Sequence, residues 1–208
     1  MSLPTRGQSF AFLEPLKGRS VIFLITSRKA HLALSRFILG CLAVRRTRTV
    51  VFDTSCFYGV NIRRIGSELP KEFLQQSTLL SVSEGQSYED SLTDLISADS
   101  AAVLIDDLNA VLHLLGSQGQ KSAMNRLSTF YNILSYNAKL SGLLVLGVAY
   151  KGDSGGFPAR STKRSLPKVS DLQVVTEVRA DEIVFRCSEI GSWPKDGFRV
   201  PLYFEERT

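Results

Sequence analysis

Four continuous apolar runs constrain the fold of this chain more than any other feature. Each run has the length of a strand, and the residues between the runs show apolar positions at helical spacing. The runs are VIFLI (21–25), TVVFD (49–53), AAVLIDD (101–107) and SGLLVLGVAY (141–150). Because a strand that is apolar on both faces must be covered on both faces, the runs predict an α/β fold: a mainly parallel sheet with helices on both sides.

Helical periodicity connects these runs, and the pattern changes after Pro158. Helices are expected at 31–44, 61–69, 88–98 and 122–140, with a weaker strand at 77–83. In the last part of the chain, VSDLQVVTEVRADEIVFRCSEI alternates apolar and polar residues around a turn at Arg179 to Asp181, and RVPLYFEER resembles a further strand. These late strands predict an antiparallel β-hairpin extension at one edge of the sheet.

Length and composition favour a single domain over residues 1–208, because a chain of 208 residues that is 44% hydrophobic can bury a full core. No run is long enough to span a bilayer, and MSLPTRGQSF lacks the apolar segment of a secretory signal. We therefore expect a cytoplasmic protein, or a nuclear one in a eukaryote, without a membrane partner. Cys41, Cys56 and Cys187 lie far apart and only His31 and His113 accompany them, so we expect reduced cysteines, no metal and no cofactor.

The loops after the strands are the candidate site, because open sheets of this kind bind ligands at the carboxyl ends of their strands. Those loops follow Ile25, Asp53, Asp107 and Tyr150. A phosphate-binding loop needs glycines so that its N–H groups can wrap the anion, a lysine for the terminal phosphates and a hydroxyl for magnesium. The first loop, TSRKAH, has no glycine.

Positive charge gives a second indication of a partner. The net charge of +5 and the pI near 9.2 permit an anionic partner without requiring one. Basic residues follow Tyr150 in the glycine-containing segment 151–168, and two more lie after the second strand. They are Lys151, Arg160, Lys163, Arg164, Lys168, Arg63 and Arg64. A flexible basic segment binds a phosphate backbone by counterion release; the alternative is that these residues form an ordinary solvated surface.

The order of these segments resembles the core of the RecA family, and within it the archaeal RadA-like recombinases and their shorter paralogues. The matching segments are TSRKAH, VVFDTSCFYGVNIRRI, AAVLIDDLNAVLHLL, STFYNILSYNAKLSGLLVLGVAY, KGDSGGFPARSTKRSLPK and LQVVTEVRADEIVFRC. They stand where the family has its phosphate loop, DTE strand, metal-binding strand, long helix with sensor strand, DNA-binding loop and closing hairpin. The resemblance runs from about Gly18 to Phe204 and implies a RecA-like fold.

Departures from the family pattern bear on activity. Alignment of LITSRKAH with GxxxxGKT places Leu24 and Lys29 at the glycines, Ala30 at the lysine and His31 at the Ser/Thr. Ser55 replaces the glutamate that polarises water in the family, while Asp106 or Asp107 remains where a carboxylate would hold magnesium. Because phosphoryl transfer depends on positioning and charge stabilisation, we expect no ATP hydrolysis. The residues of this degenerate nucleotide pocket are Ser27, Arg28, Lys29, His31, Asp53 and Asp107.

The resemblance then implies a non-catalytic accessory protein of DNA recombination or repair. It would bind single-stranded DNA, or RNA, through segment 151–168 and associate with a RecA-like recombinase, with homologous subunits or with itself as an oligomer. Segment 1–17 resembles the anchor that family members donate to a neighbour, with Phe10 and Phe12 as contacts; the alternative is a strand on the chain's own sheet edge. Two other functions stay open: an RNA- and protein-binding ring subunit like those of the Elongator accessory subcomplex, and an NTPase with an atypical phosphate loop in which Lys29 serves as the phosphate lysine.

Overall fold

The computed structural model describes residues 3–81, 90, 93–95, 100–115, 120–150, 170–187 and 189–202 of the chain. Among these residues, an eight-stranded sheet has the order β3-β2-β4-β5-β1-β6-β7-β8. The strands are β1 Ser20–Ile25, β2 Thr49–Asp53, β3 Thr78–Ser81, β4 Ala102–Asp106, β5 Leu144–Tyr150, β6 Leu172–Arg179, β7 Glu182–Arg186 and β8 Phe198–Pro201. Pairing is parallel from β3 to β6 and antiparallel from β6 to β8. The predicted mainly parallel α/β sheet with an antiparallel C-terminal extension is confirmed.

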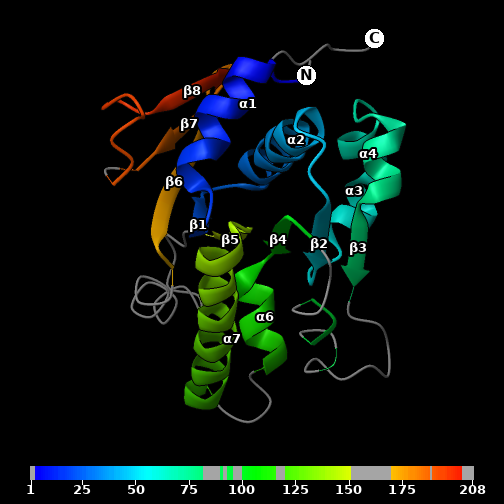
Figure 1. Cartoon of the computed structure of the whole chain (residues 1–208), viewed down its shortest axis with the longest axis vertical. Coiled ribbons are helices and arrows are strands. Elements are labelled where there is room, and N and C mark those ends of the chain that lie inside the picture. Colours follow the sequence, from blue (N-terminus) through cyan, green and yellow to red (C-terminus); the bar gives the residue numbers. More distant parts are fainter. Residues whose placement is uncertain are drawn as a thin grey trace.

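Helices cover both faces of this sheet (Figure 1), with α1 and α2 on one face and α6 and α7 on the other. The helices are α1 Arg6–Leu13, α2 Arg28–Val44, α3 Phe57–Gly66, α4 Lys71–Gln76, α6 Leu108–Leu115 and α7 Gln120–Ser141, and a 3-10 turn spans Glu14–Leu16. Side chains of β1 alternate between the faces: Val21 and Phe23 belong to the core under α1 and α2, and Ile22 to the core with α6 and α7. Two hydrophobic cores therefore hold the strands in place. None of the described helices is long and apolar enough to cross a membrane.

The predicted elements agree with the structure apart from some boundaries. The helix expected at 61–69 begins at Phe57, and the one expected at 122–140 extends over Gln120–Ser141. Helices α4 and α6 were not predicted. The α6 stretch after Asp107 is apolar enough to resemble part of the strand before it. The helix expected at 88–98 lies largely outside the described residues, although Asp90 and 93–95 are helical.

The N-terminal segment forms a helix, not the sheet-edge strand that was the alternative to an anchor. Residues Arg6–Leu13 form a helix, which begins at a capping box: Gln8 N–H donates to Thr5 Oγ1 over 3.2 Å, and Thr5 N–H donates to Gln8 Oε1 over 2.9 Å. The Phe12 side chain is wholly buried, with its ring centroid 4.7 Å from that of Phe185 and 5.1 Å from that of Trp193. The prediction of Phe12 as a partner contact is therefore wrong, because this ring belongs to the chain's own core.

Candidate functional site

The candidate site lies at the carboxyl edge of the parallel strands. Ile25 is opposite Tyr150 in the pairing of β1 with β5, and Asp53 is opposite Asp106 in the pairing of β2 with β4. A cleft of about 700 Å³ opens beside these strand ends. It is lined by Arg28, Lys29, His31, Leu32, Ser55, Cys56, Phe57, Val60, Asn61, Arg64, Asp107 and Tyr150. The four loops selected from the sequence thus begin around one cleft.

The connection from β1 to α2 is only Thr26 and Ser27. Ser27 has extended backbone and caps the helix, and its side-chain oxygen accepts from the Ala30 N–H over 3.1 Å. Arg28 and Lys29 form the first turn of α2 and are exposed. A capped two-residue connection has no run of successive N–H groups that could enclose a phosphate.

His31 lies one turn into α2, buried among side chains from three other elements. Its Nε2 is 2.5 Å from Asp106 Oδ1, at the end of β4, and its Nδ1 is 3.0 Å from the Tyr150 hydroxyl, at the end of β5. The Phe57 ring stacks on the imidazole with centroids 3.7 Å apart and an angle of 8° between the planes. Only 1% of His31 and none of Asp106 is exposed, so this is a buried pair with an aromatic cover.

The loop after β2 completes the surroundings of Asp106. Ser55 Oγ donates to Asp106 Oδ2 over 2.8 Å. The Thr54 N–H donates to the Asp106 carbonyl over 2.8 Å, and the Asp107 N–H donates to Thr54 Oγ1 over 3.1 Å. Both carboxylate oxygens of Asp106 therefore already face protein groups, and the loops after β2 and β4 are fastened to each other.

Asp53 and Asp107 take structural roles at the same edge. Asp53 is 2% exposed and its Oδ2 accepts from the Gly59 N–H over 2.9 Å, which fastens the first turn of α3. Asp107 lines the cleft, and its Oδ1 accepts from the Asn109 N–H over 2.9 Å at the start of α6. Burial raises the pKa of Asp53, and burial raises the pKa of Asp107 to about 6. The carboxylate paired with the imidazole is thus Asp106, whereas Asp107, which the sequence assigned to the pocket, lines the cleft.

Tyr150 closes the network at the end of β5. Burial, reinforced by the charges of Asp107 and Asp106, raises the pKa of its hydroxyl to about 12, so this group carries its proton at neutral pH. A proton on Nε2 of His31 faces Asp106, which leaves Nδ1 to accept from the Tyr150 hydroxyl. The imidazole therefore contacts a protein group at each of its two nitrogens.

Cations surround the cleft without joining this network. Arg28, Lys29 and Arg64 line it, whereas Arg63, in the last turn of α3, is exposed and is not part of the lining. Within the described ranges, neither Arg28 nor Arg64 has an ion-pair partner. The predicted nucleic-acid residues Lys151, Arg160, Lys163, Arg164 and Lys168 lie outside the described residues.

The geometry limits what chemistry the site can perform. Ser55 bonds to the carboxylate rather than to the imidazole, so the Asp106–His31 pair does not activate a serine nucleophile. In the described part of the chain, no group of three or more His, Cys, Asp or Glu side chains could hold a metal ion. The sequence had indicated His31 and the carboxylates, but it gave no sign that Phe57 covers the imidazole. Tyr150 ends a predicted strand that would lie beside β1, and this position could have indicated that its hydroxyl lies near His31.

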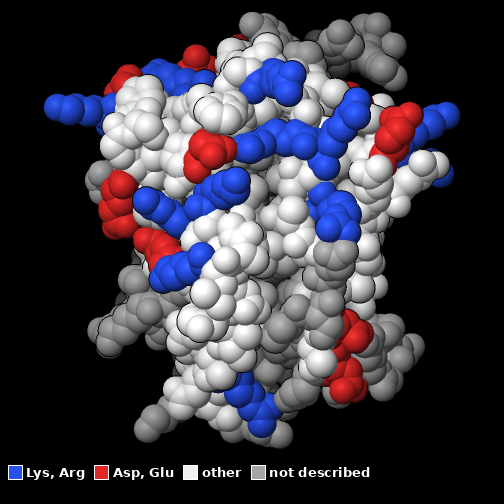
Figure 2. Space-filling model, viewed as in Figure 1, with Lys and Arg blue, Asp and Glu red and all other residues white. Residues whose placement is uncertain are grey.

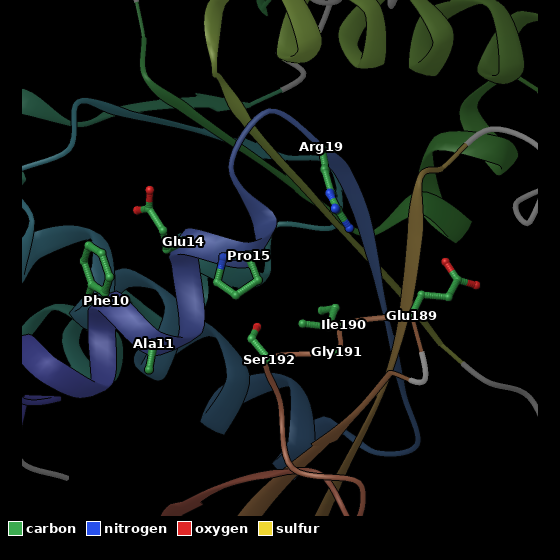
Figure 3. A pocket seen from close by; sticks show the side chains of 9 residues that line it. All are labelled: Phe10, Ala11, Glu14, Pro15, Arg19, Glu189, Ile190, Gly191 and Ser192. Carbon is green, nitrogen blue, oxygen red and sulfur yellow. The ribbon is translucent and has the colours of Figure 1, made fainter.

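Phe10, the other residue predicted as a partner anchor, lies on α1 and is not part of the cleft lining. Phe10 is 58% exposed, and the Arg45 guanidinium lies 5.6 Å from its ring centroid. Phe10 also lines a hollow of about 490 Å³ between α1 and the turn at 189–192, together with Pro15, Arg19 and Ile190 (Figure 3). Its role as a partner contact stays a prediction.

The architecture is that of a known recombinase. The chain is similar to a protein whose solved structure is described as the crystal structure of the RadB recombinase, with a TM-score of 0.59 and 15% identity over 88% of this chain and 86% of that one. Likeness at this identity concerns the fold, which is RecA-like, as the sequence predicted. No protein-family model matches the chain, and no curated protein matches it in sequence.

Proposed function

We propose that this chain is a recombinase-related protein that does not hydrolyse ATP and that binds single-stranded nucleic acid at the carboxyl edge of its sheet. The observation that carries the proposal is the buried pair of His31 and Asp106 under Phe57. In the family pattern, the position of His31 belongs to the metal-binding hydroxyl. Here an imidazole takes that position and is bonded on both nitrogens by the protein.

The loss of nucleotide chemistry is supported by what the groups at the cleft already bind. Magnesium prefers oxygen ligands in octahedral geometry, yet Asp106 faces His31 and Ser55 with its two carboxylate oxygens. The capped connection at Ser27 offers no cradle for the β- and γ-phosphates. Metal and phosphate positioning supply most of the rate of phosphoryl transfer, so hydrolysis is not expected.

Nucleic-acid binding is supported by the cations that remain. Arg28 and Arg64 face the cleft from two helices, and the basic segment that begins at Lys151 follows directly on Tyr150, which lines the same cleft. Arginine guanidinium groups bind phosphate through paired hydrogen bonds, and each phosphate contact releases counterions. The target is a backbone rather than a base sequence, so binding should depend strongly on salt.

The test combines a turnover assay with a binding assay on the full chain. We expect no ATP hydrolysis above background, with or without single-stranded DNA. Fluorescence anisotropy with labelled single-stranded DNA should show binding that the double variant Arg28→Ala/Arg64→Ala weakens about tenfold or more. The matched control, Lys71→Ala/Lys195→Ala, removes two exposed cations from other elements and should bind like the parent. Turnover that Lys29→Ala abolishes, or equal binding by both double variants, would contradict the proposal.

A further inference from the structure

The opposite, amino edge of the sheet carries a second group of cations, which we call the basic ledge. It consists of Lys17 and Arg19, just before β1, and Arg46 and Arg48, just before β2. All four side chains are exposed. Figure 2 shows Lys and Arg side chains gathered over the region of α1 and α2 and the loops that lead from them into the sheet. Because parallel strands begin at the same edge, these residues lie on the side away from the cleft.

Backbone hydrogen bonds tie this ledge into one unit. The Arg48 carbonyl accepts from the Ala101 N–H over 3.0 Å, and the Ala101 carbonyl accepts from the Leu144 N–H over 3.1 Å. The Arg19 carbonyl accepts from the Val145 N–H over 3.4 Å. The starts of β2, β4, β5 and β1 are thus connected in order. Three strand spacings separate the two ends, about 14 Å at the usual distance between neighbouring strands.

Small residues lie near the centre of the ledge. Gly18 and Gly142 have φ values of 70° and 72°, and a Cβ on Gly142 would lie 3.5 Å from Cε of Lys17. Ala101, before β4, is exposed. The Lys17 side chain therefore lies against Gly142, and the exposed Ala101 leaves the middle of the ledge without a bulky side chain.

Two carboxylates in this region pair with cations that do not belong to the ledge. Glu14 is 3.1 Å from Arg45, and Asp171 is 2.7 Å from Lys139, so each is already paired. Glu189 lines the hollow that Arg19 also lines, and Figure 3 shows the Arg19 side chain reaching toward that hollow from the loop before β1. Among the described residues, Lys17, Arg19 and Arg46 have no ion-pair partner. The ledge therefore keeps a net positive charge.

We propose that the basic ledge binds the phosphate backbone of nucleic acid as a second surface, separate from the cleft. A protein partner of ordinary size would bury an apolar centre, and the ledge offers exposed ammonium and guanidinium groups instead. A nucleic-acid backbone carries phosphates at regular intervals, so separate phosphates could bind the cations at the two ends of the ledge. This proposal rests on the nucleic-acid binding proposed above, yet the ledge can be shown not to bind while binding at the cleft stands.

Salt-dependent binding of the full chain tests this surface. The triple variant Lys17→Ala/Arg19→Ala/Arg46→Asn removes three ledge cations; asparagine suits the φ of 52° at position 46. We expect a loss of about tenfold or more in affinity for labelled single-stranded or duplex DNA. The slope of log affinity against log salt should fall by about 0.7 per lost contact on a single strand and about 0.9 on a duplex. Lys17→Arg/Arg19→Lys/Arg46→Lys should keep the parent slope, and the Lys71→Ala/Lys195→Ala control should keep both values.

The outcomes separate the two proposals. If the triple variant keeps the parent affinity and slope while Arg28→Ala/Arg64→Ala loses binding, the ledge proposal is wrong and the proposed function stands. If the parent binds no nucleic acid, both are wrong. If polyglutamate competes as well as DNA for the parent and not for the triple variant, the ledge is a site for acidic protein segments and the assignment to nucleic acid is wrong.

Discussion

At the carboxyl edge of the sheet a histidine and an aspartate are buried and paired with each other, whereas at the amino edge the cations of the basic ledge are exposed to solvent. His31 and Asp106 are 1% and 0% exposed; Lys17 and Arg19 are exposed. Ligands of open α/β sheets usually occupy the carboxyl edge. In this chain the protein's own imidazole, carboxylate and phenol hydroxyl fill part of that space.

The two edges also differ in the pKa shifts of their carboxylates: the pKa of Asp107 is raised and that of Asp171 is lowered. At the carboxyl edge, burial raises the pKa of Asp107 to about 6. At the amino edge, burial alone would raise the pKa of Asp171. The hydrogen bonds from Lys139, Ser20 and Ser135 outweigh this effect and lower the pKa to about 2. Asp171 Oδ2 accepts from Ser20 Oγ and Ser135 Oγ, each over 2.9 Å. The charged form of Asp107 therefore lowers the free energy of unfolding, whereas the charged form of Asp171 raises it.

The largest expected effect comes from breaking the buried pair. Asp106→Ala leaves His31 buried without its partner, and we expect the free energy of unfolding to fall by about 3–5 kcal/mol in urea titrations. The matched variant at the amino edge, Glu14→Ala, breaks the partly exposed pair with Arg45 and should cost about 0–1 kcal/mol. Equal losses in the two variants would remove the distinction between the edges.

The next effect is a pH dependence at Asp107. Because the folded pKa is raised, the unfolded chain releases this proton first, so stability falls as pH rises from about 4 to about 6, by about 3 kcal/mol in total. Asp107→Asn keeps an oxygen that caps α6 and removes the titration. We expect the variant to match the parent near pH 4 and to exceed it in stability at pH 7, as measured by urea unfolding at each pH. Parallel profiles would show that Asp107 does not titrate in this range.

The smallest effect has the opposite sign at Asp171. Because the folded pKa is lowered, its contribution is complete above about pH 4 and is lost as pH falls toward 2, by about 2 kcal/mol. Asp171→Asn should therefore destabilise the chain at pH 7 and differ less from the parent at lower pH. Lys139→Met serves as a partial control, because it removes one partner while the serine donors remain. A variant as stable as the parent at pH 7 would contradict this account.

Much of the sheet could be predicted from the sequence because buried parallel strands leave a local sign, a short apolar run. The antiparallel hairpin at Arg179 was equally local. The prediction for Phe12 was wrong because the resemblance to an anchor did not reveal that this segment forms a helix. Residues two apart on a helix point in different directions, so Phe12 is buried while Phe10 is exposed. The capping box at Thr5 and Gln8 was the overlooked sign of a helix.

The site was harder to predict because its contacts join distant parts of the chain. Alignment placed His31 and an aspartate near each other, but which aspartate met the imidazole depended on where β4 ends. The stacking of Phe57 depends on how α3 packs on α2, and the Tyr150 contact on the pairing of β5 with β1. Neither contact follows from residue spacing, because each depends on tertiary packing.

The position of β1 in the sheet has a consequence for synthesis on the ribosome. This strand emerges early, yet its two neighbours begin at Leu144 and Leu172. The backbone N–H and C=O groups along its two edges stay unpaired until most of the polypeptide has been translated. We therefore expect newly made chains to need protection by a chaperone until β5 and β6 have left the exit tunnel.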